Sequence, residues 1–212
     1  VIISPDHHTA AYLAVLDESG DLAVSVDDMG ILEIIKPQYI FRQRKWFRQA
    51  SMVMMDPNVA PSTMELVFRL AERYQVPVAM NTVSTALAPR VRPFLSQLAV
   101  LAANLAEASA VVGRKLTDHT EAMAAARELV SAGVKIAVIT LAKNGLCYAT
   151  PRESGYISAI ACDVVDNTGA GAALMAAVLY GLILQMPVVE AMRLGVSAAT
   201  LTTAFYGWLA RG

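Results

Sequence analysis

The chain has 212 residues, which is enough for one large domain or two small ones. Apolar residues make up 56% and charged residues 17%, against usual shares of about 45–50% and about 25%. Most helices and strands should therefore be buried on several sides, or part of the surface should face a partner. The net charge is −1 and no long run of like charge occurs, which argues against nucleic acid as a partner.

The cysteines and histidines show no pattern typical of a metal site. Cys147 and Cys162 lack metal-ligand spacing, and we interpret both as small buried hydrophobic residues in a reducing, cytoplasmic compartment. His7, His8 and His119 have no Cys or His partner at ligand spacing. A zinc site is therefore not predicted.

One uncharged segment, residues 167–189, is long enough to cross a bilayer. It begins with a glycine-rich turn and ends near Pro187, and its strictly apolar part, residues 172–184, is shorter than a spanning helix. A buried core helix is the favoured interpretation, and no membrane partner is predicted. No charged leader or cleavage site opens the chain.

The first predicted element is a β-hairpin. Residues 12–16 and 22–26 are rich in β-forming side chains, and Glu18-Ser19-Gly20-Asp21 lies between them. From residue 37 onward, helical and strand-like segments alternate. The expected helices are 37–49, 62–74, 91–98, 104–112, 118–132 and 172–184, and the expected strands are 52–55, 76–80, 100–101, 136–141, 146–149 and 156–161.

Continuous apolar runs such as residues 136–139 indicate a parallel sheet that is covered on both faces. Ligands of such sheets bind at the carboxyl ends of the strands. The polar residues expected at these ends are Asp56, Asn81, Asn104 and Thr140.

Three short patterns near those ends could carry chemistry. The Gly-Ala-Gly run at 169–171 precedes an apolar helix, so its backbone N–H groups either hold an anion or simply form a tight turn. Asn104 and Glu107 either place Mg²⁺ or form a helix N-cap, and the N-cap is favoured when the pair is taken alone. Thr140, at the start of 140–145, either meets a phosphate or ends a strand before an Asn-Gly turn.

The order of these patterns resembles the PfkB (ribokinase-like) family of sugar and nucleoside kinases. The specific stretches are NLAE at 104–107, TLAKNG at 140–145 and DNTGAG at 166–171. Further resemblance, most like the pseudouridine kinase branch, runs through nearly the whole chain. It lies in residues 12–17, 28–29, 81–84 and 198–200.

This resemblance implies a three-layer α/β fold with a mostly parallel sheet and helices on both faces. It also implies a lid-type β-hairpin in residues 1–30 and a ribokinase-like core in residues 31–212. The implied activity is ATP-dependent phosphoryl transfer to a hydroxyl of a sugar or nucleoside, pseudouridine-like or ribose-like, with ATP and Mg²⁺. Such kinases act mainly by positioning and charge stabilisation.

The resemblance also implies roles for individual residues. Gly169, Ala170 and Gly171 would form the anion hole, and Asn104 with Glu107 would place metal and phosphates, Glu107 being the metal residue. The remaining nucleotide-binding positions that the resemblance implies are Thr140, Gly145, Asp166, Thr168 and Ala199.

The chain departs from the family pattern at its reactive position. Ala172 stands where the family has the Asp that takes the proton from the attacking hydroxyl, and such help is typically worth about 10²–10⁴ in rate. Ala142 replaces a Gly, Ala103 replaces a Pro, and Asn81-Thr82 replaces Asp-Pro. We therefore expect an impaired or inactive kinase. The alternatives are a non-catalytic nucleotide-binding, sugar-phosphate-binding or assembly protein, and a remodelled domain whose fold has outlasted its site.

The sequence also lacks the family's N-terminal section, with its first strands and a Gly-Gly substrate motif, and begins at Val1 inside the lid. This predicts a chain that is shortened on its N-terminal side, whether as a fragment or as a processed product. An open sheet edge invites pairing, so we expect a homodimer through this edge or through the hairpin, residues 11–28. Restoring the acid by Ala172→Asp should not alone restore normal activity.

Overall fold

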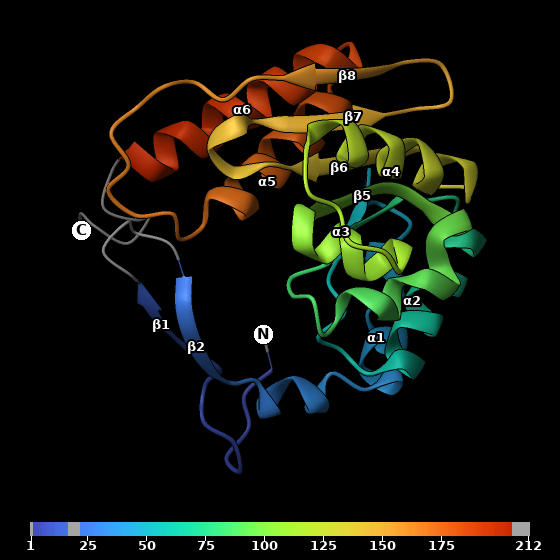
Figure 1. Cartoon of the computed structure of the whole chain (residues 1–212). Helices are drawn as coiled ribbons and strands as arrows, with labels where there is room; N and C mark the ends of the chain where they lie inside the picture. The colour runs from blue at the N-terminus through green and yellow to red at the C-terminus, as the bar shows by residue number, and fades with distance from the viewer. Residues whose placement is uncertain (1, 17–21, 205–212) are drawn as a thin grey trace.

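The computed structural model describes residues 2–16 and 22–204 and has the predicted three-layer α/β architecture (Figure 1). The strands are β1 (Ala11–Leu16), β2 (Leu22–Asp28), β3 (Val53–Met55), β4 (Val78–Asn81), β5 (Leu98–Asn104), β6 (Ile136–Thr140), β7 (Leu146–Ala149) and β8 (Ser154–Ile157). The α-helices are α1 (Pro37–Arg42), α2 (Pro61–Tyr74), α3 (Leu105–Val112), α4 (His119–Ser131), α5 (Ala170–Ile183) and α6 (Val188–Ala204). Short 3₁₀ helices are η1 (Gly30–Ile34), η2 (Arg44–Trp46), η3 (Ala88–Gln97) and η4 (Ala142–Asn144).

The main sheet has six strands in the order β3-β4-β5-β6-β7-β8. The pairs from β3 to β6 are parallel, and β7 and β8 are antiparallel additions. The sheet is therefore mostly parallel, as predicted, and β8 forms one edge. The opposite edge of the described sheet is β3.

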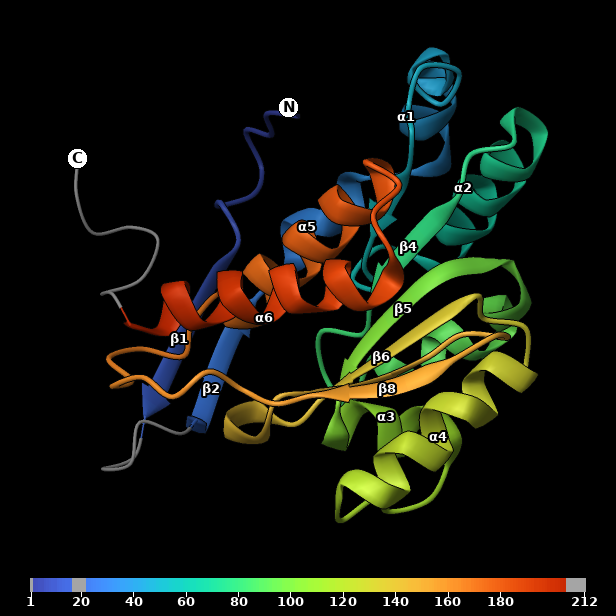
Figure 2. The ribbon, with the colours of Figure 1, turned by 90° about the horizontal axis from the view of Figure 1, so that it is seen from above.

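Two apolar layers enclose this sheet. Side chains of α2, α3 and α4 pack on one face around Met80, Leu101 and Ile139. On the other face, α5 and α6 pack on Val100 and Val138. Figure 2 shows the two helical layers on opposite sides of the strands. Burial on both faces explains why β5 and β6 are continuous apolar runs rather than alternating ones.

The parallel pairing brings strand ends from distant parts of the chain together. Asn81, the last residue of β4, pairs with Ala102, and Asn104, the last residue of β5, pairs with Thr140, the last residue of β6. Polar side chains that the sequence spreads over about sixty residues thus share one end of the sheet. This is the end at which ligands bind in such folds.

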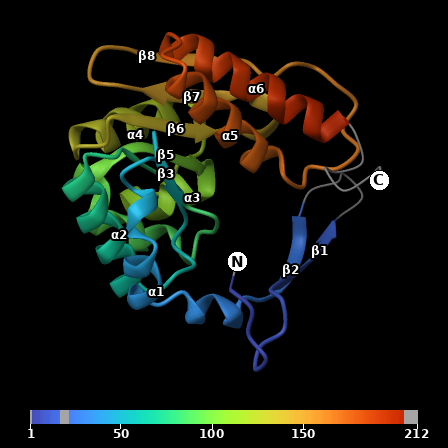
Figure 3. The same cartoon turned by 180° about the vertical axis from the view of Figure 1, so that it is seen from behind.

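The N-terminal hairpin stands apart from the main sheet (Figures 1 and 3). β1 and β2 pair in antiparallel fashion, with Leu13 opposite Val26 and Val15 opposite Val24. Because side chains alternate along a strand, these four residues share one face, and all four are exposed. The predicted turn, residues 18–21, lies outside the described residues.

Some local expectations were wrong. In place of the predicted helix 37–49, the α-helix α1 ends at Arg42, and the 3₁₀ helix η2 follows it. The tighter turn lets Phe47 bury while Trp46 stays exposed and donates from Nε1 to Gln43 Oε1 at 3.2 Å. Lys45 lies over the Trp46 ring.

The last strand of the sheet begins earlier and ends earlier than predicted, at 154–157 instead of 156–161, since Ser154 already pairs with Ala149. The segment 88–97 is 3₁₀ rather than α-helical, because Pro93 inside it has no N–H to donate. α6 covers residues for which no helix was predicted.

The two cysteines differ from each other. Cys147 is buried in β7, as predicted, but Cys162 is exposed, so its assignment to the core was wrong. Its segment leaves the sheet after β8 and runs to α5 past the end of α6, where Cys162 Sγ lies 3.7 Å from Thr203 Oγ1 (Figure 3). The uncharged segment before residue 189 forms α5 and the turn into α6, and none of the described helices is both long and apolar enough to span a bilayer.

Candidate functional site

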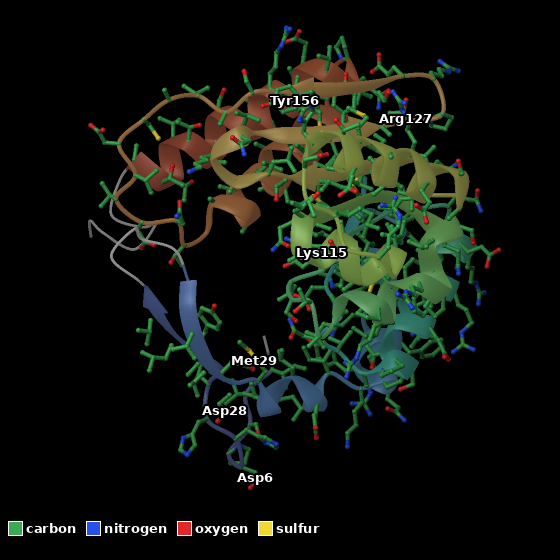
Figure 4. All side chains as sticks on the ribbon, viewed as in Figure 1. Asp6, Asp28, Met29, Lys115, Arg127 and Tyr156 are labelled. Atoms are coloured by element: carbon green, nitrogen blue, oxygen red, sulfur yellow. The ribbon has the colours of Figure 1, made fainter. Side chains whose placement is uncertain are left out.

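A cleft of about 890 Å³ opens at the carboxyl ends of β5 and β6. Asn104 and Thr140, which are paired neighbours in the sheet, both line it. The first turns of α3 and α4 and the turn after β6 form its walls. The other lining residues are Leu105, Ala106, Thr117, Asp118, His119, Leu141, Ala142, Asn144 and Tyr156. Figure 4 labels Tyr156, which comes from the edge strand β8.

The start of α3 is closed by a reciprocal capping box. Asn104 Oδ1 accepts from the Glu107 N–H at 2.9 Å, and Glu107 Oε2 accepts from the Asn104 N–H at 2.9 Å. Such a cap satisfies two N–H groups that the helix itself leaves free. The N-cap interpretation of this pair is confirmed, and the metal role of Glu107 stays a prediction.

Glu107 has a further partner that the sequence did not reveal. Its Oε2 also accepts from the Thr82 hydroxyl at 2.6 Å. Glu107 is only 6% exposed and Thr82 is fully buried. The carboxylate is therefore held from β5 and from the end of β4 at once.

The donor set here can be compared with the needs of Mg²⁺. This ion uses one or two carboxylates and completes its shell with waters and substrate phosphates. Within residues 2–16 and 22–204, the hydrogen bonds to the Glu107 carboxylate all reach Oε2, which leaves Oε1 without a protein donor there. Within the same ranges no cluster of three His, Cys, Asp or Glu side chains forms an all-protein cage. A single carboxylate of this kind fits a magnesium ion that is shared with phosphates.

The turn after β6 explains two residues of the 140–145 pattern. Gly145 has φ +92°, and a Cβ there would lie 2.0 Å from the Ile157 carbonyl oxygen, so only glycine fits. Ala142, in the place of the family's glycine, has φ +49°, in the left-handed region that costs a non-glycine residue energy. The backbone thus keeps the shape that glycine favours. The nucleotide role predicted for Gly145 stays a prediction.

The start of α5 lies at the same end of the sheet as the carboxyl ends of β5 and β6 (Figures 1 and 2). Gly169 is the N-cap with φ +85°, and no side-chain hydrogen bond from the described residues caps this helix. The Ala170 N–H reaches the Asn167 carbonyl at 3.3 Å. A Cβ built on Gly171 would meet nothing within 4 Å, so packing does not require this glycine. Ala172 is exposed in the same turn.

Asp166 shapes the turn that leads into Gly169. Its Oδ1 accepts from the Thr168 N–H at 2.8 Å, and this bond holds the pKa of the Asp166 carboxyl below its usual value. The Val165 N–H donates to the Thr203 carbonyl at 2.8 Å, which ties the turn to the end of α6. Ala199, on the same helix, is half-buried and packs on the core beneath α5 and α6.

Most of the predicted site residues fall into two groups, while Gly145 lies in the turn after β6 and Ala199 lies on α6. Asn104 and Thr140 meet in the cleft, with Glu107 buried directly behind Asn104. Gly169 to Ala172, Asp166 and Thr168 gather at the start of α5, and none of them lines the cleft. The sequence analysis named Thr82 only as a departure from the family pattern, and its contact with Glu107 was not predicted.

Comparison with known proteins identifies this architecture. A sequence model described as pfkB family carbohydrate kinase matches residues 1–207. The chain belongs to the pfkB carbohydrate kinase family. The pseudouridine kinase of Escherichia coli K12 is 28% identical over 193 residues, which cover 91% of this chain and 61% of that protein.

Two solved structures share the pfkB fold of this chain. The ribokinase of Giardia lamblia superposes with a TM-score of 0.82 at 18% identity, over 94% of this chain and 67% of that one. The Arabidopsis thaliana ribokinase, solved in complex with ribose and ATP, gives 0.71 at 22% identity, over 78% of this chain and 54% of that one. The chain therefore spans between 54% and 67% of the length of these three relatives.

Proposed function

We propose that this chain carries the nucleotide half of a pfkB-type site and serves ATP-dependent phosphoryl transfer to a hydroxyl of a sugar or nucleoside. The observation that carries the proposal is the open start of α5. Among the described residues, no side-chain hydrogen bond caps this helix, and a Cβ built on Gly171 would meet nothing within 4 Å beyond the helix's own neighbouring backbone. Free N–H groups and the helix dipole favour an anion at such a position.

The remaining residues have roles in positioning. Asn104 and Thr140 offer an amide and a hydroxyl from adjacent strand ends, where a nucleotide's phosphates would lie between them and the start of α5. Glu107 would hold Mg²⁺, which when bound would offset the negative charge of the phosphates. Asp166, by accepting from the Thr168 N–H, fixes the turn that aims the α5 amides. This division fits a reaction that depends on positioning and charge.

Ala172 limits the expected rate. In the transfer, the acceptor oxygen bonds to the terminal phosphorus, the bond to ADP breaks, and the acceptor hydroxyl loses its proton. An alanine methyl cannot take that proton, so the proton passes to water or phosphate, and about 10²–10⁴ in rate is lost. The exposed Ala172 therefore favours a second candidate function, binding of a nucleotide or sugar phosphate without turnover.

The acceptor class and the assembly are parts of the same proposal. The named substrates of the relatives, pseudouridine and ribose, support a ribose-like acceptor. The exposed apolar face of the hairpin, formed by Leu13, Val15, Val24 and Val26, supports pairing with a second copy. An isolated two-stranded hairpin is marginally stable in water, so covering this face would stabilise it. The free edge of β3 is the other surface that could pair.

Calorimetric titration with ATP, with and without Mg²⁺, tests the proposal, and a coupled assay for ADP release in the presence of pseudouridine or ribose tests turnover. ATP binding that strengthens with Mg²⁺ is the expected result. Slow ADP release that depends on the acceptor supports the kinase, and binding with no release supports the non-catalytic alternative. Absence of ATP binding up to millimolar concentrations would refute both.

A further inference from the structure

The buried contact between Thr82 and Glu107 points to a positioning residue at the end of β4. Thr82 is fully buried, and its hydroxyl lies 2.6 Å from Glu107 Oε2 and 3.3 Å from the Ala102 carbonyl oxygen. A hydroxyl has one proton to donate. The hydroxyl therefore donates to the Glu107 carboxylate, which is the nearer of the two acceptors. Hydrogen bonds to charged groups are about twice as strong as those between neutral groups.

The backbone around Thr82 is held in one place. The Thr82 N–H donates to the Ala102 carbonyl at 3.1 Å, and the Ser84 N–H reaches back to the Thr82 carbonyl at 2.7 Å. This tight turn forces Val83 to φ +64°, a conformation that is strained for a β-branched residue. Strain of this kind persists only where the surrounding structure fixes it, and it concentrates at functional positions.

The two bonds to Glu107 leave its two carboxylate oxygens in different situations. Oε2 receives the Thr82 hydroxyl and the Asn104 N–H, whereas neither of these donors reaches Oε1. A carboxylate that is held through one oxygen cannot rotate freely, so the direction of the other oxygen is fixed. Partners that orient a ligating group in this way commonly change metal affinity about 10–100-fold when they are lost.

We infer that Thr82 positions the Glu107 carboxylate for a divalent cation, a role that rests on the proposed function of Glu107. The hydroxyl comes from a residue that replaces the proline of the family pattern, so it is a contact of this chain rather than of the pattern. Asn104 contributes a second donor to the same oxygen, but this is a backbone group that only proline would remove, and proline there would also remove the helix cap. Thr82 is therefore the side chain through which this geometry can be tested.

The test compares Thr82→Val, which keeps the shape and removes the hydroxyl, with Thr82→Ser, which keeps the hydroxyl. Thr63→Val is the matched control: Thr63 is also buried and donates at 2.8 Å, but to the Ile35 carbonyl far from the cleft. The control shows how much of any effect comes from losing a buried hydroxyl.

The first readout needs no metal or nucleotide. Thr82→Val should speed hydrogen exchange of the Asn104 amide about 10-fold, since a carboxylate that moves no longer protects it, and neither Thr82→Ser nor Thr63→Val should do so. Unchanged exchange in Thr82→Val overturns the inference, whatever the nucleotide results.

The second readout is the gain in ATP affinity that Mg²⁺ provides. Thr82→Val should reduce this gain about 10-fold or more, while Thr82→Ser and Thr63→Val keep it. An equal gain in Thr82→Val and in the parent chain overturns the inference. A third outcome is that Mg²⁺ does not raise the ATP affinity of the parent chain, while Asn104 exchange in Thr82→Val still responds as expected. In that case Glu107 does not hold Mg²⁺ as proposed, and the cation role inferred for Thr82 is refuted as well.

Discussion

The substitution Gly171→Ala separates the need for glycine in folding from the need for glycine in ligand binding. A Cβ at position 171 would meet no atom within 4 Å, so the fold has room for the methyl group. Gly171 is also the second residue of α5, and alanine stabilises a helix interior by about 0.8–1 kcal/mol relative to glycine. In the first turn we expect about half of that value.

For the free protein, the stability should therefore rise by about 0.5 kcal/mol, or about 1–2 °C in melting temperature for a chain of this size. The affinity for ATP should change in the opposite sense. A methyl group at this position would block close approach of a phosphate to the amides, and one lost hydrogen bond to a charged group is worth about 1.5–3 kcal/mol. The dissociation constant should rise about 10- to 100-fold.

Gly195→Ala is the matched control in the adjacent helix α6. Its Cβ would lie 2.5 Å from Val178 Cγ2 and 3.1 Å from the Leu174 carbonyl oxygen, where α5 and α6 pack closely. We expect this variant to lose about 1–3 kcal/mol of stability through overpacking while keeping the ATP affinity of the folded fraction. Thermal denaturation and calorimetric titration measure both quantities. A Gly171→Ala variant that binds ATP within twofold of the parent would refute the anion-binding role proposed for the start of α5.

Three further predictions concern stability, thiol reactivity and pH. Ala142→Gly should raise the free energy of unfolding by about 0.5–1 kcal/mol in chemical denaturation, because relief of the left-handed strain at φ +49° exceeds the added chain entropy, and a loss would contradict this assignment. Ellman's reagent should modify one thiol quickly, the exposed Cys162, and a second only in denaturant, because burial shields Cys147 and raises the pKa of its thiol; two fast thiols in the native protein would be inconsistent with the packing of β7. The pKa of Asp166 is lower in the folded state than in the unfolded state. Its ionised carboxylate therefore stabilises the fold at pH values above the unfolded-state pKa, and this stabilisation is lost as the pH falls through the folded-state pKa. Asp166→Asn should flatten the acid limb of a stability-against-pH curve, and an identical limb would show that the Thr168 bond contributes nothing.

Local patterns in the sequence were sufficient for the elements whose burial is uniform. β5 and β6 are largely apolar because both faces of the sheet are covered. A continuous apolar run of this kind indicates a strand of a parallel sheet even when its neighbouring strands are not known. The caps are equally local: Asp118 accepts from the Glu121 N–H at 2.8 Å, and Asn104 and Glu107 bond within a single turn. Short-range geometry of this kind depends on spacing along the chain alone.

The sequence was less informative where a contact depends on strand order. Thr82 and Glu107 are 25 residues apart and meet only because β4 and β5 are parallel neighbours. Cys162 looks like a core residue by type, but it lies in the segment between β8 and α5, outside both core clusters, and is exposed.

By itself, the sequence determined the α/β class, the order of the three kinase-like patterns and the presence of alanine at position 172, because each of these is a matter of residue type and spacing. Only the tertiary structure decided that Glu107 is buried with one oxygen held by Thr82, and that Gly171 faces open space while Gly145 and Gly195 are fixed by packing. The physical reason is that a side chain's environment depends on what the fold brings to it from elsewhere in the chain. Two glycines can therefore have opposite surroundings: Gly171 faces open space, whereas Gly195 lets two helices pack closely.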